Sequence, residues 1–313
     1  MNPAVAEIMR QSASRSELLK RRLDAFARAL KALERQEVRG LHRARVASRR
    51  LRELVPILQL DHGAARKLIR RLRKVTTRLG TVRELDVLLL SIDELQVAGC
   101  GAGSALGLVG MAVSKDRDRA RKRLDGRLPM AGVWRLARKL DRLVARLQIE
   151  EASATRAEER GWRWAVDARV ARRATRVEKA IEQAGPLYLT DRLHDVRVAL
   201  KKLRYAAEVQ AEIQGVRPSP LQRLLGRAQD LLGRMRDLQT LIDRVRQVQA
   251  SLAPPTLVEW RDLDALVLSL EDDCRRLHAR YMTIRDQLLT SAAAAQSRAR
   301  TPSAPAATAR RAG

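Results

Sequence analysis

Two stretches of the chain, LHRARVASRRLR at 41–52 and LHDVRVALKKLR at 193–204, align without a gap and share seven of twelve positions. Two further positions exchange Arg for Lys, so charge is kept where identity is not. A second pair follows in the same order, LRKVTTRLGTVRELDVLL at 72–89 and LGRAQDLLGRMRDLQTLI at 225–242. This ordered repetition predicts two similar halves related by a pseudo-twofold axis, because two copies are too few for a solenoid.

Apolar residues recur at helical spacing along nearly the whole chain, and the alternating pattern of strands is missing. The sequence therefore predicts an all-α fold in which each half is a helical bundle of about four helices. Glycines and prolines set the breaks between helices, among them Gly80 and Gly233. The expected helices are 15–36, 39–60, 63–79, 81–97, 105–148, 152–185, 190–214, 218–232, 234–251 and 256–290.

The domain is expected to span residues 15–290, with a first half at about 15–148 and a second half at about 152–290. Residues 1–14 then form an N-terminal extension. Residues 291–313 are rich in Ala, Pro, Ser and Arg, which predicts a disordered basic tail. The uncharged stretch 95–114 contains five glycines, so it indicates a linker rather than a transmembrane helix.

The first pair of repeats carries a basic stripe beside an apolar one. At about 100° per residue, the basic residues fall within an arc of roughly 80° that flanks a core-facing arc of Ala and Leu. Like charges at this spacing repel, so a face that only contacts water would normally mix signs. The basic residues take the same angular positions around the helix in both copies, which favours an anion-binding groove or pore between the halves. The residues are His42, Arg45, Arg49 and Arg52 in the first copy, and His194, Arg197, Lys201 and Arg204 in the second.

The second pair of repeats adds further candidate ligands for an anion. They are Lys74, Arg78 and Arg83 in one copy and Arg227 and Arg236 in the other. These side chains could instead pair with nearby acids. We expect Arg83 and Arg236 to do both, held by a neighbouring acid while facing the groove. Arg grips two phosphate oxygens with its planar fork, and a protonated His is favoured beside phosphate.

Composition limits the partner to a polyanion. The 313 residues carry 63 Lys and Arg against 36 Asp and Glu, a formal net charge of +27. Only eight residues are aromatic, and only Tyr205 adjoins a basic run, so base stacking on single-stranded nucleic acid is disfavoured. Cys100 and Cys274 are isolated, which excludes a disulfide framework and a zinc motif and fits a reducing, cytoplasmic compartment.

The four motifs resemble, in sequence and in order, those of the CHAD domain, the conserved histidine α-helical domain. The resemblance spans roughly residues 15–290 and implies two four-helix halves around a basic groove. It adds Lys202 to the candidate ligands, because His194, Arg197, Lys201, Lys202 and Arg204 match the second of the family's His-containing motifs. It also implies binding of inorganic polyphosphate and, in bacteria, association with polyphosphate granules. One departure is RDLQ at 236–239 where the first copy has RELD at 83–86, which puts an acid-dependent arrangement in the second half in doubt.

Three functions remain open at this point. The first is non-catalytic binding of long-chain polyphosphate, with no cofactor or metal and no membrane contact. The second is binding of nucleic acid through the net charge and the basic tail. The third is an enzyme acting on polyphosphate; it is disfavoured because phosphoryl transfer usually needs metal-binding carboxylates and the acids here are scattered. The oligomeric state is not predicted.

Overall fold

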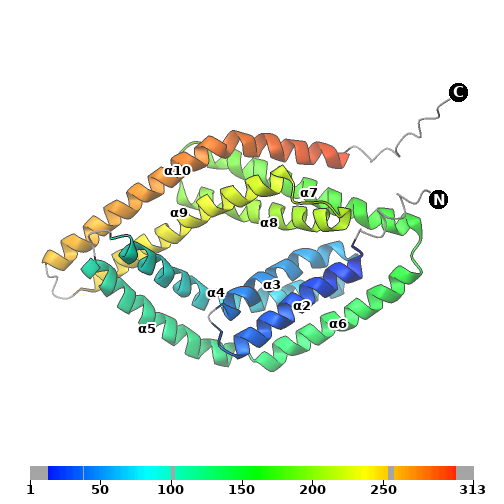
Figure 1. Cartoon of the computed structure of the whole chain (residues 1–313), viewed down its shortest axis with the longest axis horizontal. Helices are drawn as coiled ribbons and strands as arrows, with labels where there is room; N and C mark the ends of the chain where they lie inside the picture. The colour runs from blue at the N-terminus through cyan, green and yellow to red at the C-terminus, as the bar shows by residue number, and fades with distance from the viewer. Residues whose placement is uncertain (1–12, 38, 100–102, 253–256, 301–313) are drawn as a thin grey trace.

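The structure, a computed structural model, describes residues 13–37, 39–99, 103–252 and 257–300. These residues form nine α-helices and one short 3₁₀ helix and contain no strand, which confirms the all-α prediction. They are α2 (Arg15–Glu34), α3 (Gly40–Leu54), η1 (Val55–Ile57), α4 (His62–Val97), α5 (Gly103–Arg127), α6 (Met130–Ala152), α7 (Arg156–Ala184), α8 (Thr190–Gln214), α9 (Pro220–Ser251) and α10 (Leu257–Arg300). Packed pairs such as α2 and α3 or α7 and α8 run antiparallel (Figure 1).

Local sequence signals explain where several helices begin and end. Capping boxes start α2 at Ser14, α7 at Thr155 and α9 at Ser219, each with a Glu or Gln three residues later that returns the hydrogen bond. Gly185 ends α7 and Gly215 ends α8, both with φ near +60° (62° and 63°), a conformation that glycine adopts without steric cost.

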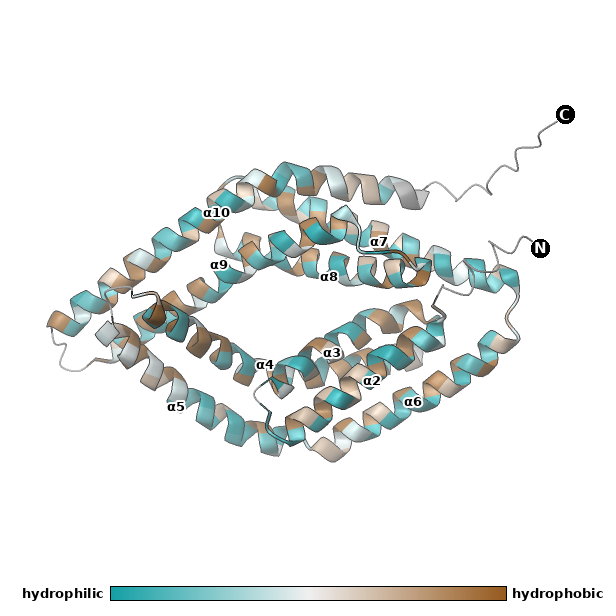
Figure 2. Ribbon diagram, viewed as in Figure 1, coloured by the Kyte–Doolittle hydropathy of each residue, from teal (hydrophilic) through white to brown (hydrophobic). Residues whose placement is uncertain are grey.

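Three apolar cores hold the helices together. The first joins α2, α3, α6 and the N-terminal part of α4, and it also takes Trp162 from α7 and Val209 from α8. The second joins α7, α8, the N-terminal part of α9 and the C-terminal part of α10. The third joins the remaining parts of α4, α9 and α10 with α5, so Leu88 and Leu241, aligned in the repeat, are buried in one core. Figure 2 shows hydrophobic and hydrophilic residues alternating along the helices, as amphipathic helices require.

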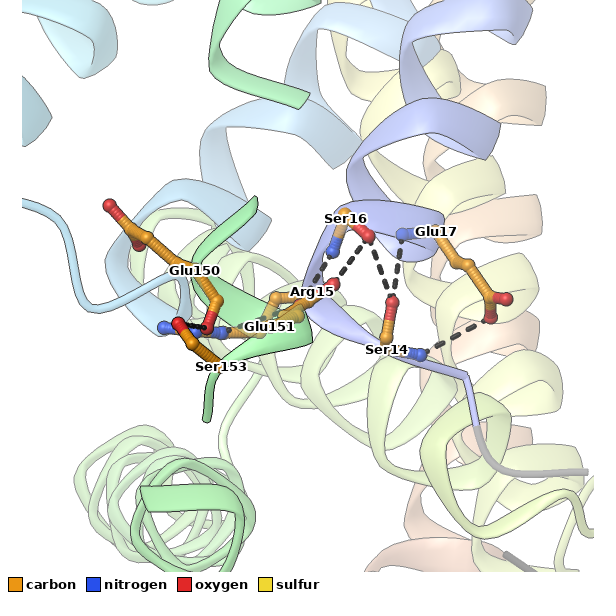
Figure 3. Close-up of polar contacts among 7 residues, drawn as sticks. All are labelled: Ser14, Arg15, Ser16, Glu17, Glu150, Glu151 and Ser153. Atoms are coloured by element: carbon orange, nitrogen blue, oxygen red, sulfur yellow. Dashed lines mark hydrogen bonds and ion pairs between the residues drawn. The ribbon is translucent and has the colours of Figure 1, made fainter. Parts of the chain in front are cut away.

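A polar clamp fixes the start of α2 to the end of α6 (Figure 3). The backbone N–H of Ser16 donates to Oε1 of Glu151 at 3.0 Å, and the Ser16 hydroxyl donates to Oε2 at 2.5 Å. Arg15 Nε lies 3.5 Å from the same carboxylate. Because a helix N-terminus presents unpaired N–H groups, an acid from a neighbouring helix is favoured there.

The predicted breaks at Gly80 and Gly233 are wrong, because α4 and α9 each run through the glycine without interruption. A helical glycine costs only about 1 kcal/mol relative to alanine, and each of these helices packs against neighbours on both sides of the glycine. Conversely, the expected helix 105–148 is two helices, α5 and α6. Pro129 ends the run because it has no N–H to donate inside a helix.

The expected disordered tail is also wrong over residues 291–300, which continue α10. Alanine is the strongest helix former, and this segment contains four in succession. Ala292 is buried in the second core, and Gln296 Nε2 donates to Glu178 of α7 at 2.7 Å. Residues 301–313 of the predicted tail and residues 1–12 of the predicted extension lie outside the described residues. Within the described part of the chain, no helix is both long enough and apolar enough to cross a membrane.

Candidate functional site: a cation-lined cavity

A cavity of about 520 Å³ opens between α3 and α4 on one side and α8 and α9 on the other. In Figure 1 these two pairs of helices face each other across the centre of the molecule. Ten of the fourteen predicted ligands line this cavity. They are His42, Arg45, Arg49 and Arg52 of α3, Arg83 of α4, His194, Arg197, Lys201 and Lys202 of α8, and Arg236 of α9.

The other four predicted ligands lie elsewhere. Lys74 and Arg227 are exposed and Arg78 is half-buried, all three outside the cavity lining. Lys74 precedes Arg83 by nine residues, and Arg227 precedes Arg236 by nine, which places each about 180° around its helix from the cavity-facing arginine. Arg204 points away to Glu208, at 3.0 Å, and to Gln229, at 3.2 Å.

In each copy of the repeat, the paired glycine lies beside an arginine of a neighbouring helix. A Cβ at Gly80 would lie 3.5 Å from Nη2 of Arg45, and a Cβ at Gly233 would lie 3.8 Å from Nε of Arg197. Arg45 and Arg197 are themselves aligned in the repeat. Both distances are ordinary van der Waals contacts, so the guanidinium from α3 lies close to α4, and the one from α8 lies close to α9, without requiring glycine there.

Burial and neighbouring cations lower the pKa values of two side chains in the site. Burial, followed by the charges of Arg197, Arg49 and Arg45, lowers the pKa of Lys201 to about 7. Burial and the neighbouring Arg45 lower the pKa of Arg49 to about 10. Both shifts mean that the free cavity holds more positive charge than its surroundings stabilise.

The pKa values of the two cavity histidines are also lowered. Burial is the largest cause that lowers the pKa of His42, and Arg83 is the next; for His194 burial is followed by Arg236. Both imidazoles therefore favour the neutral form in the free protein. A neutral imidazole can donate one N–H to a phosphate oxygen, and a bound anion would raise its pKa again.

Three acids also line the cavity: Glu53, Glu84 and Asp237. Glu53 accepts hydrogen bonds of 2.9 Å from Arg169 and Arg173 of α7, so its charge is already matched. Glu84, two-thirds exposed, lies 3.4 Å from Arg45. Burial raises the pKa of Asp237 against the opposing effect of Arg197. Eight Arg and Lys side chains in the lining thus exceed the acids.

The expectation that neighbouring acids hold Arg83 and Arg236 is wrong for the described residues. Neither arginine forms an ion pair there. Glu84 forms one with Arg45 instead, and Asp86 forms one with Arg121 of α5, at 3.6 Å. The departure at Gln239 has a visible consequence, because this amide bonds to Asp243 of its own helix at 3.3 Å instead of to another helix. Two groups free of acids, Arg83 and Arg236, therefore face the cavity.

Some lining residues were not among the predicted ligands. Glu53 and Tyr205, which occupy aligned positions of the repeat, both line the cavity, as does Thr240 of α9. The sequence offered a clue to Tyr205, which is the one aromatic residue beside a basic run. The sequence offered no clue to Glu53, because its partners Arg169 and Arg173 lie on a helix outside the repeat motifs. The described residues hold no group of three or more metal-liganding side chains.

Comparisons with known proteins agree with this fold. The family model of the CHAD domain matches residues 17–246. The fold is similar to the crystal structure of the CHAD domain from the plant Ricinus communis, with a TM-score of 0.57 and 18% identity over 94% of each chain. It is also similar to PptA from Streptomyces chartreusis, with a TM-score of 0.54 and 20% identity over 91% of this chain and 97% of that one. No curated protein matches the sequence.

Proposed function

The chain belongs to the CHAD domain family, and we propose that it binds inorganic polyphosphate in the cation-lined cavity without chemically changing it. The observation that carries this proposal is the convergence of eight Arg and Lys side chains and two histidines from four helices on one cavity. Polyphosphate has one negative charge per unit and no bases. A cavity rich in cations and poor in aromatic rings suits such a polymer better than it suits single-stranded nucleic acid.

Binding without catalysis is supported by the state of the cavity's acids. Glu53 is occupied by two arginines, and Asp237 is the acid whose charged form burial disfavours. Hydrolysis of a phosphoanhydride usually relies on carboxylates that hold divalent cations. Release of phosphate from polyphosphate in the presence of magnesium or manganese would contradict this part of the proposal.

The role in the cell follows from the family resemblance. We infer that the protein associates with polyphosphate granules in the cytoplasm of a bacterium. A fluorescent fusion should co-localise with stained granules and become diffuse when polyphosphate synthesis is removed. A diffuse or nucleoid distribution in cells that contain granules would contradict it.

Competition binding at near-physiological salt tests the proposal directly. Labelled long-chain polyphosphate is displaced either by unlabelled polyphosphate or by duplex DNA. We expect polyphosphate to compete at least about tenfold better, because the cavity offers direct charged hydrogen bonds while DNA binds through net charge. Equal competition by DNA would favour the alternative function, nucleic-acid binding.

A matched pair of variants assigns the binding to the cavity. Arg49→Gln/Lys201→Gln removes two cavity cations and should weaken polyphosphate binding by about a hundredfold or more. Arg135→Gln/Arg138→Gln removes the same charge from the exposed surface of α6, which α2 separates from the cavity helices. Unchanged affinity in the first variant, or equal losses in both, would refute a cavity site.

A further inference from the structure

Helix α7 carries a third basic stripe outside the repeat motifs. Arg169, Arg172, Arg173 and Arg176 follow the spacing i, i+3, i+4 and i+7, which places them on one helix face. The buried face of the same helix contains Val170, Ala174 and Val177 and lies beside this stripe. The arrangement repeats that of α3 and α8, where a basic stripe flanks a core-facing one.

The α7 stripe is continuous with the mouth of the cavity. Glu53, which lines the cavity, bonds to both Arg169 and Arg173 at 2.9 Å. Lys202, another lining residue, has a pKa lowered first by burial and then by the charges of Arg173 and Arg176. These side chains therefore lie close enough to form one field of positive charge that leads from the cavity onto α7.

The stripe has too few acids for an ordinary solvated face. Glu53 is shared by Arg169 and Arg173, while Arg172 and Arg176 are exposed and form no ion pair with any described residue. Helix α2 precedes α3 as α7 precedes α8, and it shows the opposite pattern. There each of three neighbouring cations has an acid: Lys20 pairs with Asp24 and Asp141, Arg21 with Glu17, and Arg22 with Glu212.

A long polyphosphate chain is larger than the cavity, whose volume is about 520 Å³, so part of the chain must lie outside it. A cationic surface without acids at the mouth of the cavity stabilises the emerging segment of the chain more than solvent alone does. We propose that the exposed stripe of α7, through Arg172 and Arg176, binds the segment of polyphosphate that emerges past Arg52 and Lys202, and so makes the protein prefer long chains. This inference rests on the proposed function of the cavity and adds a second, external part to the binding site.

The test compares tripolyphosphate with long-chain polyphosphate on four proteins: the unmodified chain, the cavity variant, the α6 control variant and Arg172→Gln/Arg176→Gln. The α7 variant should bind tripolyphosphate as the unmodified chain does. Its affinity for long chains should fall about fivefold, because two exposed charge contacts are lost. The dependence of its long-chain affinity on salt should also become shallower, by roughly 0.7 per lost contact in a logarithmic plot.

The outcomes separate this inference from the proposed function. Long-chain affinity of the α7 variant equal to that of the α6 control would overturn the inference. Equal losses for tripolyphosphate and long chains would also overturn it, because the arginines would then act on the cavity. A cavity variant that still binds polyphosphate would contradict the proposed function instead, whatever the α7 variant does.

Discussion

The affinity for polyphosphate should fall as pH rises from 7 to 9, and Lys201 should cause most of the change. In the free protein the pKa of Lys201 is about 7, against an ordinary value of 10.5. A phosphate chain in the cavity adds negative charge beside this ammonium and raises its pKa. Binding therefore takes up a proton between about pH 7 and the higher pKa of the complex, and raising the pH in this range opposes binding.

The size of the effect follows from the two protonation equilibria. If the complex restores the ordinary pKa, Lys201 is charged in the complex throughout this range, while its charged fraction in the free protein falls from about one half at pH 7 to about 1% at pH 9. The affinity then drops by about 50-fold, or roughly 2.3 kcal/mol. Below pH 7 the Lys201 contribution levels off, because the ammonium is charged in both states.

Lys201→Arg is the matched control. Arginine keeps the charge in this range, and the aligned position of the other repeat is already Arg49. Affinities for long-chain polyphosphate, whose end groups are few, would be measured by competition at constant ionic strength from pH 6 to 9. The variant should bind with little change between pH 7 and 9. Parallel curves for the two proteins would refute the reasoning, since His42, His194 or the ligand would then cause the dependence.

Three other predictions concern stability and are each checked by denaturant or thermal unfolding. Gly80→Ala should leave the free energy of unfolding unchanged or raise it by up to about 1 kcal/mol, because its Cβ would meet Arg45 only at 3.5 Å. Gly40→Ala should lower it by about 2 kcal/mol, since its Cβ would lie 2.7 Å from the backbone of Ala32; equal effects would contradict this contrast. Glu53→Gln should lower it by about 3 kcal/mol by leaving two half-buried arginines without their acid; a loss under 1 kcal/mol would show that water replaces the carboxylate. Long-chain polyphosphate should raise the melting temperature of the unmodified chain, and by much less that of Arg49→Gln/Lys201→Gln; equal shifts would contradict a cavity site.

Helical periodicity predicted most of the fold because amphipathic helices bury one face wherever they pack. The errors came from residues whose effect depends on context. Glycine was interpreted as a break at 80 and 233, although a helix supported on both sides of the glycine tolerates it. Pro129 was overlooked inside a periodic stretch, although it removes a hydrogen bond that the helix needs. The alanine-rich segment 291–300 was taken for a tail because the burial of Ala292 and the hydrogen bond from Gln296 to Glu178 depend on tertiary packing.

The same glycine error explains which predicted ligands lie outside the cavity. With α4 and α9 cut at Gly80 and Gly233, the phase of Lys74 relative to Arg83 was undefined. The continuous helices set that phase, and they direct Lys74 and Arg227 away from the cavity. On α3 and α8 no break intervened, and the phase predicted there holds for every residue except Arg204. The α7 stripe was not predicted, because only the tertiary structure brings Arg173 to Glu53.

The cavity's charges also link the function of the site to the stability of the protein. Unfolded Lys201 has an ordinary pKa of 10.5, so between about pH 7 and that value the unfolded state binds more protons than the folded one. The free energy of unfolding contributed by this group therefore rises with pH through this range, while the affinity for a polyanion falls. Both trends have one origin: the folded chain brings cations together at a free-energy cost that a bound polyanion would offset. In the free protein the burial of apolar side chains must offset that cost, and on both α3 and α8 a buried apolar face lies directly beside the basic stripe.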